Sequence, residues 1–540
     1  MKNQTNIIHG PQDVLNLPKD LSLGQLLFEQ LRIHGSRVSQ VDAITGEELT
    51  YEQILDRSIK LAIYLRHEGL VSNDCISICS ENNLNFCIPM CAASYLGVTI
   101  NTLNPLYTES EFQHTLNISK PKIIFVSRVS LKSIQSITKD FSWKPKLILF
   151  FKSNDVNLPN IYDIVSNIKD ADKNTLQICK IDVTTHVAVI LNSSGTSGLP
   201  KGVMLTDKNL LAVIKSLGNP SYGFPQNDVV TLGLLPLFHS YAFITSIMKL
   251  VIGIKTVLLP RFEEETFLKV IERYRIQYLS LVPPLVLFLA KHPIVDKYDL
   301  SSVTTITCGA APLSQEIQNT VSKRLNLKEI KQGYGLTETT LAVTITPNCK
   351  NKPNSIGLLL PGVSAKVIPI DDNDSNTALP PNCKGELCFK GDFIMKGYCG
   401  DTSSTAATID EDGWLHTGDV GYYDEDGYFF IVDRLKELIK YKGFQVPPAE
   451  LEAILLTHSG IKDAAVIGIP DEEAGELPMA FVVLQPTSKI TADDIIKYVN
   501  ERVSSHKRLR GGVRFVDSIP KAPSGKILRR VLRNQIKSKL

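Results

Sequence analysis

Residues 193–202 read Ser193-Ser-Gly-Thr-Ser-Gly-Leu-Pro-Lys-Gly202 and follow an apolar run, His186-Val-Ala-Val-Ile-Leu191, that predicts a buried strand. Glycines allow tight turns that point backbone N–H groups toward an anion, hydroxyls donate hydrogen bonds, and Lys201 adds a mobile positive charge. The loop is not a Walker A motif, because Lys201 is followed by Gly202 and the glycine spacing differs. The alternative is a flexible Gly/Ser linker, which the strand, the proline and the lysine disfavour. The stretch therefore predicts a loop that binds nucleotide phosphates.

Length and charge limit the classes of protein to consider. A chain of 540 residues is too long for one hydrophobic core, so we expect two or more domains. A net charge of +2 argues against a general nucleic-acid binder, which would carry a strong basic excess. Residues 1–20 lack the apolar segment of a signal peptide, and the longest apolar stretch, residues 241–259, is interrupted by Lys249 and Lys255. We therefore expect neither a nucleic-acid partner nor a transmembrane segment.

Ten cysteines are scattered singly along the chain. Cys75 and Cys79, like Cys87 and Cys91, are four residues apart, a spacing at which a metal site is conceivable. Their apolar neighbours favour buried free thiols instead. This pattern indicates a reducing intracellular compartment.

The final three residues, Ser538, Lys539 and Leu540, match the tripeptide that a peroxisomal import receptor reads. The tripeptide follows a basic stretch at residues 529–537 and stands at the extreme end of the chain. The alternative is an ordinary frayed C-terminus. We expect the import receptor as a partner and the peroxisome as the location.

Apolar patterns predict strands that alternate with helices through the first three hundred residues. Residues 52–66 and 264–274 have helical periodicity. Short strands are predicted at residues 75–79, 122–126, 256–259 and 278–282. Alternation of this kind predicts parallel sheets with helices on both faces.

A change in pattern divides the rest of the chain. Residues 357–390 have short apolar runs broken by proline and glycine, which predicts a small β-subdomain. A break near Asp433 precedes a tail that is long enough for a small domain. The tail predicts helices at 448–457 and 492–503, the latter capped by Thr491 and Asp494, and strands at 464–469 and 479–484. We therefore expect an α/β protein with a large N-terminal domain of α/β sheets (residues 1–433), which includes the β-subdomain, and a small α+β C-terminal domain (residues 434–540).

Further motifs carry side chains suited to a nucleotide. In residues 332–339, the ring of Tyr334 could stack on a base, Thr337 could bind a phosphate, and Glu338 suits a hard, oxygen-liganded Mg²⁺. The alternative for Glu338 is a solvated surface carboxylate, although no helical face is present to which it would belong.

Three more charged residues could bind a nucleotide, but each also has a purely structural interpretation. Asp419 could accept hydrogen bonds from both ribose hydroxyls or could cap a turn. Arg434, at the predicted domain break, could reach a phosphate or the ribose, or could form an interdomain salt bridge. Lys526 follows Ser-Gly and could bring its charge to a reacting carboxylate or phosphate, or could be a solvated loop lysine.

With five motifs in order over nearly the whole chain, the sequence resembles the adenylate-forming enzymes, a superfamily of acyl-CoA synthetases, 4-coumarate–CoA ligases and beetle luciferases. Residues 431–443 and 507–513 resemble the beetle luciferases and their insect relatives, the luciferase-like acyl-CoA synthetases, most strongly. The resemblance implies an N-terminal domain that binds ATP and a carboxylic acid, and a mobile C-terminal domain that closes over them and then rotates about a hinge at residues 433–436.

The resemblance also implies a role for each matching residue. Phosphate binding would fall to Ser193, Ser194, Gly195, Thr196, Ser197, Gly198 and Lys201. The adenosine would contact Gly333, Tyr334, Gly335, Asp419 and Arg434, and the CoA channel would form from Lys440, Lys442, Gly443 and Phe444. The implied catalytic residues are Lys526, His239, Thr337 and Glu338, with Glu338 also the Mg²⁺ ligand. The implied cofactors are ATP, Mg²⁺ and CoA.

These residue types suit the chemistry. A carboxylate is a weak nucleophile, and it faces an anionic phosphate. Positive charges must offset that repulsion and stabilise the charge that develops around the α-phosphorus. Orientation supplies much of the remaining rate enhancement. Pyrophosphate leaves, and the thiol of CoA then displaces AMP from the acyl group.

The residues near His239 help to decide which class of acid is the substrate. His239 matches a histidine that borders the acid pocket of acyl-CoA ligases, although a core histidine would look the same. Luciferases place a histidine and a glycine where this chain has Phe238 and Ser240, a serine where it has Leu341, and an arginine within the segment that matches 216–220. The more apolar pocket favours an ATP-dependent acyl-CoA ligase for medium-to-long fatty acids. A luciferase that oxidises luciferyl-adenylate with O₂ and a 4-coumarate-type ligase are the alternatives.

Overall fold

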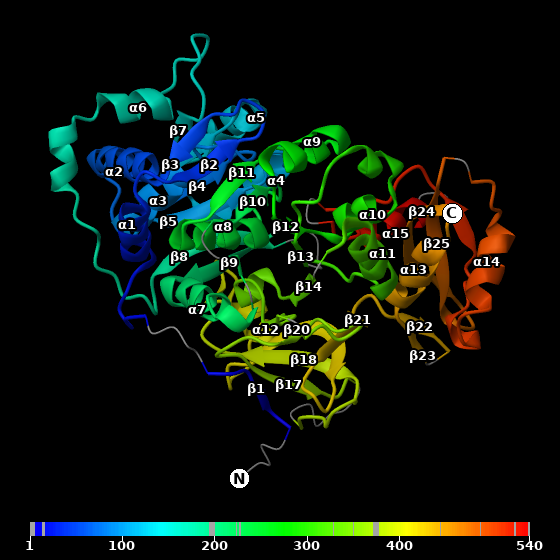
Figure 1. The fold of residues 1–540 in the computed structure, drawn as a ribbon. Coiled ribbons are helices and arrows are strands. Elements are labelled where there is room, and N and C mark those ends of the chain that lie inside the picture. Colours follow the sequence, from blue (N-terminus) through cyan, green and yellow to red (C-terminus); the bar gives the residue numbers. More distant parts are fainter. Residues whose placement is uncertain are drawn as a thin grey trace.

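A computed structural model describes residues 6–12, 17–193, 200–222, 224–225, 228–327, 329–348, 350–370, 377–442, 444–486, 488–522 and 525–537. Four sheets organise this part of the chain (Figure 1). Two are mixed sheets in an α/β arrangement, one is antiparallel, and the fourth belongs to a small C-terminal α+β unit. The expected fold class is therefore confirmed.

The first α/β sheet has the strand order β19-β9-β8-β5-β4-β6-β7. Strands β8, β5, β4, β6 and β7 are parallel, whereas β9 and β19 run antiparallel to their neighbours. The bounds are β4 (Cys75–Cys79), β5 (Thr99–Leu103), β6 (Ile123–Val126), β7 (Lys146–Leu149), β8 (Val187–Ser193), β9 (Lys201–Thr206) and β19 (Gly397–Tyr398). Buried residues occupy every position of β4, β5 and β6, as expected for strands covered on both faces.

The second α/β sheet has the strand order β16-β15-β14-β13-β12-β10-β11-β2-β3. Its bounds are β2 (Val38–Asp42), β3 (Glu48–Thr50), β10 (Val230–Gly233), β11 (Lys255–Leu258), β12 (Tyr278–Leu281), β13 (Thr305–Cys308), β14 (Glu329–Tyr334), β15 (Thr344–Ile345) and β16 (Leu358–Leu359). The strands from β14 to β2 are parallel. The carboxyl end of β14 therefore lies at the same sheet edge as the ends of β12 and β13, which is where ligands bind in open α/β sheets.

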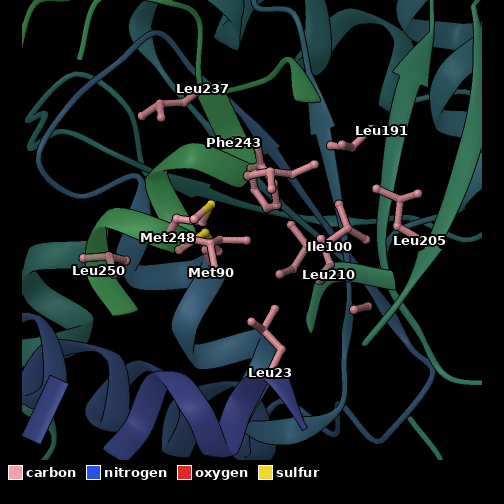
Figure 2. Packing of buried hydrophobic residues seen from close by; sticks show 14 of the residues in the cluster. Leu23, Met90, Ile100, Leu191, Leu205, Leu210, Leu237, Phe243, Met248 and Leu250 are labelled. Atoms are coloured by element: carbon pink, nitrogen blue, oxygen red, sulfur yellow. The ribbon is translucent and has the colours of Figure 1, made fainter. Parts of the chain in front are cut away.

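Helices cover both sheets. Their bounds are α1 (Leu23–His34), α2 (Tyr51–His67), α3 (Cys87–Leu96), α4 (Glu109–Ser119), α5 (Arg128–Thr138), α6 (Ile161–Asn167), α7 (Asp207–Leu217), α8 (Ser240–Ile252), α9 (Glu264–Tyr274), α10 (Pro283–Lys291) and α11 (Gln315–Leu325). Short 3₁₀ turns occupy Asp170–Thr175, Pro220–Tyr222, Pro293–Lys297, Thr337–Thr339 and Ser505–Lys507. Figure 2 shows Met90 of α3 beside Met248 of α8, with Phe243 and Ile100 nearby, in the core that joins helices to the first sheet.

The antiparallel sheet differs in membership from the predicted β-subdomain. Its order is β1-β17-β18-β20-β21, with bounds β1 (Ile8–His9), β17 (Ser364–Ile368), β18 (Gly385–Lys390), β20 (Leu415–Tyr423) and β21 (Phe429–Arg434). Helix α12 (Thr402–Thr408) precedes β20. Residues 357–390 supply only two of these strands, because β16 joins the second α/β sheet and β1 arrives from more than 350 residues earlier. Local periodicity holds no information on such distant pairing.

The C-terminal unit contains its own sheet and core. Its bounds are β22 (Ile439–Tyr441), β23 (Phe444–Val446), α13 (Pro448–Thr457), β24 (Ile461–Asp471), β25 (Gly475–Leu484), α14 (Ala492–Asn500), β26 (Val513–Phe515) and α15 (Arg529–Lys537). Helix α13, the strand pair and the capping box of Thr491 with Asp494 match the predictions. In Figure 1 this unit lies beside α10 and α11. Strand β21 runs through residues 433–434, so the expected domain boundary falls at the end of a strand.

The nine cysteines that the structure describes are all free thiols. Cys75, Cys79, Cys87 and Cys91 are buried, as the sequence predicts. Burial raises the pKa of the Cys79 and Cys87 thiols to about 12. Within the described residues, no helix has the length and apolar character needed to cross a membrane.

Candidate active site

A pocket of about 490 Å³ lies where the α/β sheets meet the antiparallel sheet and the C-terminal unit. Among the predicted site residues, ten line it: Ser193, Lys201, His239, Gly333, Tyr334, Gly335, Thr337, Glu338, Arg434 and Lys526. They come from three sheets, from the segments that follow β10 and β14, and from the loop before α15. The structure therefore brings together residues that are more than 330 positions apart in the chain.

The predicted phosphate loop connects β8 to β9. Ser193 and Lys201 are paired across these antiparallel strands, which holds both ends of the loop at the pocket. The Nζ atom of Lys201 donates to Ser404 Oγ at 2.6 Å and lies 4.7 Å from the ring centre of Tyr398. The Oγ atom of Ser193 is buried without a hydrogen-bond partner among the described residues. An anion here would give that hydroxyl an acceptor. Residues Ser194, Gly195, Thr196, Ser197 and Gly198 lie outside the described residues.

The segment from Gly333 to Glu338 begins in the last two residues of β14 and enters a 3₁₀ turn. A Cβ atom at Gly335 would lie 1.7 Å from the carbonyl oxygen of Leu341, so only glycine fits. Glu338 is half-buried, and its Oε1 accepts a hydrogen bond from the Tyr398 hydroxyl at 3.0 Å. Glu338 is therefore not a fully solvated surface carboxylate, which was the alternative interpretation of its sequence position. Its carboxylate is a hard oxygen donor at the pocket wall, which fits Mg²⁺.

Asp419 lies behind the pocket and is only 3% exposed. Its Oδ2 accepts a hydrogen bond from Tyr334 Oη at 2.7 Å, and its Oδ1 lies 3.0 Å from Arg434 Nε. Burial, followed by the charge of Asp419, raises the pKa of Tyr334 well above its usual value, which keeps the phenol protonated as a donor. Both partners hold this carboxylate in one orientation. Arg434 is beside Asp419, as the resemblance implies.

Lys526 reaches the pocket from the C-terminal unit. The preceding Gly525 has φ +81°, and a Cβ atom there would lie 3.2 Å from Pro284 Cδ at the start of α10. Burial and the positive charge of Arg434 lower the pKa of Lys526 to about 8, against the opposing pull of Asp419, Glu437 and Glu338. The ammonium is therefore desolvated and placed among charged groups, rather than on a solvated loop.

His239 lines the pocket at the start of α8. Burial lowers the pKa of its imidazole to about 4, so the ring is neutral near pH 7. Its Nε2 atom is buried and has no hydrogen-bond partner in the described part of the chain. An imidazole whose buried ring nitrogen has no partner differs from a satisfied core histidine.

Four of the described predicted residues do not line the pocket. Asp419 lies behind it, and Lys440, Lys442 and Phe444 are exposed on the hairpin of β22 and β23, where Phe444 is 53% exposed and stacked on His506. Gly443 and the tripeptide at residues 538–540 lie outside the described residues.

The sequence alone did not single out Tyr398, which bonds to Glu338 and packs on Lys201. It also missed Glu386 and His416, which line the pocket from β18 and β20. The dipeptide Gly397–Tyr398 is a weak signal, because neither residue carries a charge or follows a recognisable spacing. Glu386 and His416 come into contact only through antiparallel pairing.

The fold and the pocket together define an adenylate-forming enzyme. The family model described as "AMP-binding enzyme" matches residues 27–399, and the model of the AMP-binding enzyme C-terminal domain matches residues 450–526. The chain belongs to this family. It is an acyl- or aryl-CoA ligase or a luciferase-like enzyme, the two kinds represented among its similar relatives.

Relatives match the chain over its length. Luciferin 4-monooxygenase of Nipponoluciola cruciata is 42% identical over 99% of this chain and 98% of its own. The 4-coumarate–CoA ligase CCL1 of Humulus lupulus is 38% identical over 96% of this chain and 95% of its own. The crystal structure of ATP-bound MatB from Rhodopseudomonas palustris, 26% identical, covers 96% of this chain and all of its own with a TM-score of 0.85.

Proposed function

We propose that this protein is an ATP-dependent acid–CoA ligase that adenylates a carboxylic acid and transfers the acyl group to CoA. The observation that carries the proposal is the meeting of Lys526 with Lys201, Thr337 and Glu338 in one pocket. Three anions must approach one another there: the acid, the α-phosphate and the leaving pyrophosphate. The pocket supplies positive charge from Lys201 and from Lys526.

Each residue has a defined task in adenylation. Lys201 and the Ser193 hydroxyl would bind the β- and γ-phosphates, and Thr337 would donate to the α-phosphate. Glu338 would hold Mg²⁺, which offsets phosphate charge when bound. Asp419, oriented by Tyr334 and Arg434, would accept the ribose hydroxyls. Lys526 would lie between the carboxylate and the α-phosphate and stabilise the charge that develops as the new P–O bond forms.

The transfer to CoA requires a second arrangement of the C-terminal unit. Lys440, Lys442 and Phe444 are exposed and away from the pocket. We assign residues 1–433 to the acid- and ATP-binding domain and 434–540 to the mobile domain, with a hinge at residues 433–436. Rotation there would withdraw Lys526 and bring the β22–β23 turn, with Gly443, to the acyl site.

The wall around His239 supports an aliphatic acid. Leu217, Phe224 and Ile345 contribute apolar surface. Two tyrosine hydroxyls of the wall are already paired: Tyr278 Oη lies 2.5 Å from Thr307 Oγ1, and Tyr241 Oη donates to the Thr307 carbonyl at 3.2 Å. Neither phenol needs a polar group on the ligand, and medium-to-long fatty acids are the proposed substrates.

An assay of the purified protein with ATP, Mg²⁺, CoA and a panel of acids tests this proposal. The panel holds medium- and long-chain fatty acids, 4-coumarate and luciferin, and the readouts are AMP, acyl-CoA and light. We expect AMP and acyl-CoA with fatty acids. AMP release only with aryl acids would replace the fatty-acid proposal by a 4-coumarate-type ligase, and strong light with luciferin would replace it by a luciferase. Failure of every acid in ATP–pyrophosphate exchange would overturn the adenylation chemistry.

We also propose that the protein acts in the peroxisome, imported through a receptor that reads Ser538, Lys539 and Leu540. The support is the sequence alone. A fluorescent protein fused to the N-terminus should colocalise with a peroxisomal marker, and deletion of residues 538–540 should leave it dispersed. Equal distributions would contradict the proposal.

A further inference from the structure

Glu386, Cys388 and His416 form a three-donor cluster on the antiparallel sheet, at the wall of the pocket but apart from Glu338. Glu386 and Cys388 are two positions apart on β18, so their side chains share one face. His416 is the cross-strand partner of Cys388 on β20. One carboxylate oxygen, one thiol sulfur and one imidazole nitrogen lie within 4.8 Å of one another.

The spacing of these donors suits a small tetrahedral cation. His416 Nδ1 lies 3.2 Å from Glu386 Oε2 and 3.6 Å from Cys388 Sγ. A tetrahedral ion with bonds of about 2.0 Å to nitrogen and oxygen and about 2.3 Å to sulfur separates its ligands by roughly 3.3–3.5 Å. The two distances to Nδ1 are close to this separation, and the third pair, Glu386 with Cys388, lies within 4.8 Å.

Second contacts hold His416 and Glu386 in place. The other ring nitrogen of His416, Nε2, lies 3.4 Å from Asp410 Oδ2, the carboxylate–histidine arrangement that supports metal-bound imidazoles. Glu386 Oε1 accepts a hydrogen bond from the Gly418 backbone at 2.8 Å, which leaves Oε2 directed at the imidazole.

The charges in this cluster also balance around a dication. Glu386, Asp410 and a Cys388 thiolate would carry three negative charges. Lys366 Nζ, 4.0 Å from Asp410 Oδ2, carries one positive charge, and a divalent ion would supply the other two. Cys388 is fully buried, and its thiol would release its proton as the sulfur binds the ion. A thiolate with an imidazole and a carboxylate selects Zn²⁺ over Mg²⁺.

We propose that Glu386, Cys388 and His416 bind one zinc-class divalent ion, with Asp410 as a positioning residue and the fourth coordination position open to the pocket. This site is independent of the Mg²⁺ expected at Glu338. Through Glu386 and Gly418, the ion would also fix the backbone immediately before Asp419.

Metal titration of the full chain without nucleotide tests the site. The protein is stripped with a chelator, and Co²⁺ is added as a spectroscopic probe, followed by Zn²⁺ in competition. We expect one Co²⁺ per chain, a thiolate-to-cobalt charge-transfer band and intense tetrahedral d–d bands, all removed by Zn²⁺ and unaffected by excess Mg²⁺. A spectrum without the charge-transfer band, or weak octahedral bands, would overturn the proposal.

Variants locate the ion on these residues. Cys388→Ser should abolish the charge-transfer band, and Asp410→Asn should weaken Co²⁺ affinity about 10–100-fold while the band persists. Cys308→Ser is the matched control, because Cys308 is buried and lines the same pocket outside the cluster. If Cys388→Ser fails to fold, Glu386→Gln replaces it in the test. We expect this variant to lose the tetrahedral d–d bands. Unchanged binding in the variant that folds would refute the assignment.

Discussion

Lys526 is a cation placed in a pocket that already holds Arg434, and that proximity together with burial sets its chemistry. The charge of a solvated lysine is screened by the surrounding water. A desolvated lysine attracts anions more strongly, because the local dielectric is low. The same environment makes the charge easy to lose in mildly alkaline solution.

Replacement of Lys526 should separate the two half-reactions. Lys526→Ala should lower the rate of ATP–pyrophosphate exchange about 10²–10³-fold, as expected for loss of one charged transition-state contact. Thioester formation from supplied acyl-adenylate and CoA should be largely spared. Lys521→Ala is a matched control, because Lys521 lies on the same loop but pairs with Asp463 at 2.6 Å. Equal losses in both half-reactions would count against the alternating role.

The pH profile of adenylation should report the same lysine. Lys526 is charged below its pKa of about 8 and neutral above it, so kcat/KM for ATP should fall as pH rises through about 8. Lys526→Arg should remove this alkaline decline, because guanidinium stays protonated. A decline of the same midpoint in Lys526→Ala would assign it to another group.

At the scale of elements, sequence patterns predicted what local periodicity controls. The helix at residues 264–274 and the strand at 75–79 have the predicted bounds, and β24 and β25 extend beyond the predicted ones. The pairing of β2 with β11 joins strands more than 200 residues apart and has no local signature. The same limit applies to the site. Motif residues were found because glycine and charge mark them, whereas Tyr398 acts only through a contact that distant strands create.

The turn after β14 offers a paired test of backbone fit. Gly335→Ala would drive a Cβ atom into the Leu341 carbonyl, so the free energy of unfolding should fall by more than about 2 kcal/mol. Gly333→Ala, two residues earlier, would place its Cβ atom no closer than 3.7 Å to the neighbouring atoms and should change stability by about 0.5 kcal/mol or less. Chemical denaturation of both variants measures the difference. Similar losses would mean that the turn can relax.

At the scale of the whole molecule, the contacts that join the C-terminal unit to the large domain include two near α10, in the arrangement that inserts Lys526. One is the packing of Gly525 near Pro284, and the other is a hydrogen bond of 2.6 Å from Lys291 Nζ to the Leu456 carbonyl. Lys291 is half-buried at this contact, and burial lowers the pKa of its ammonium. Under the proposed mechanism, such a contact would favour the adenylation arrangement over the rotated one.

Removal of the Lys291 contact should shift that balance. A charged hydrogen bond contributes about 1.5–3 kcal/mol, so Lys291→Ala should slow adenylation by roughly tenfold or more while sparing thioester formation from supplied acyl-adenylate. Lys297→Ala, an exposed lysine in the following 3₁₀ turn, is the control. Slower thioester formation with normal adenylation would reverse the assignment of the two arrangements.

The pairing of β1 with β17 also bears on solubility. Ile8 and His9 cover one side of β17, whose other side is paired with β18. Without β1, the backbone groups of Ser364 and Ala365 on that side would be left as an open sheet margin, which is a template for strand addition by another molecule. A truncation that removes residues 1–10 should therefore promote self-association even though it leaves the pocket complete.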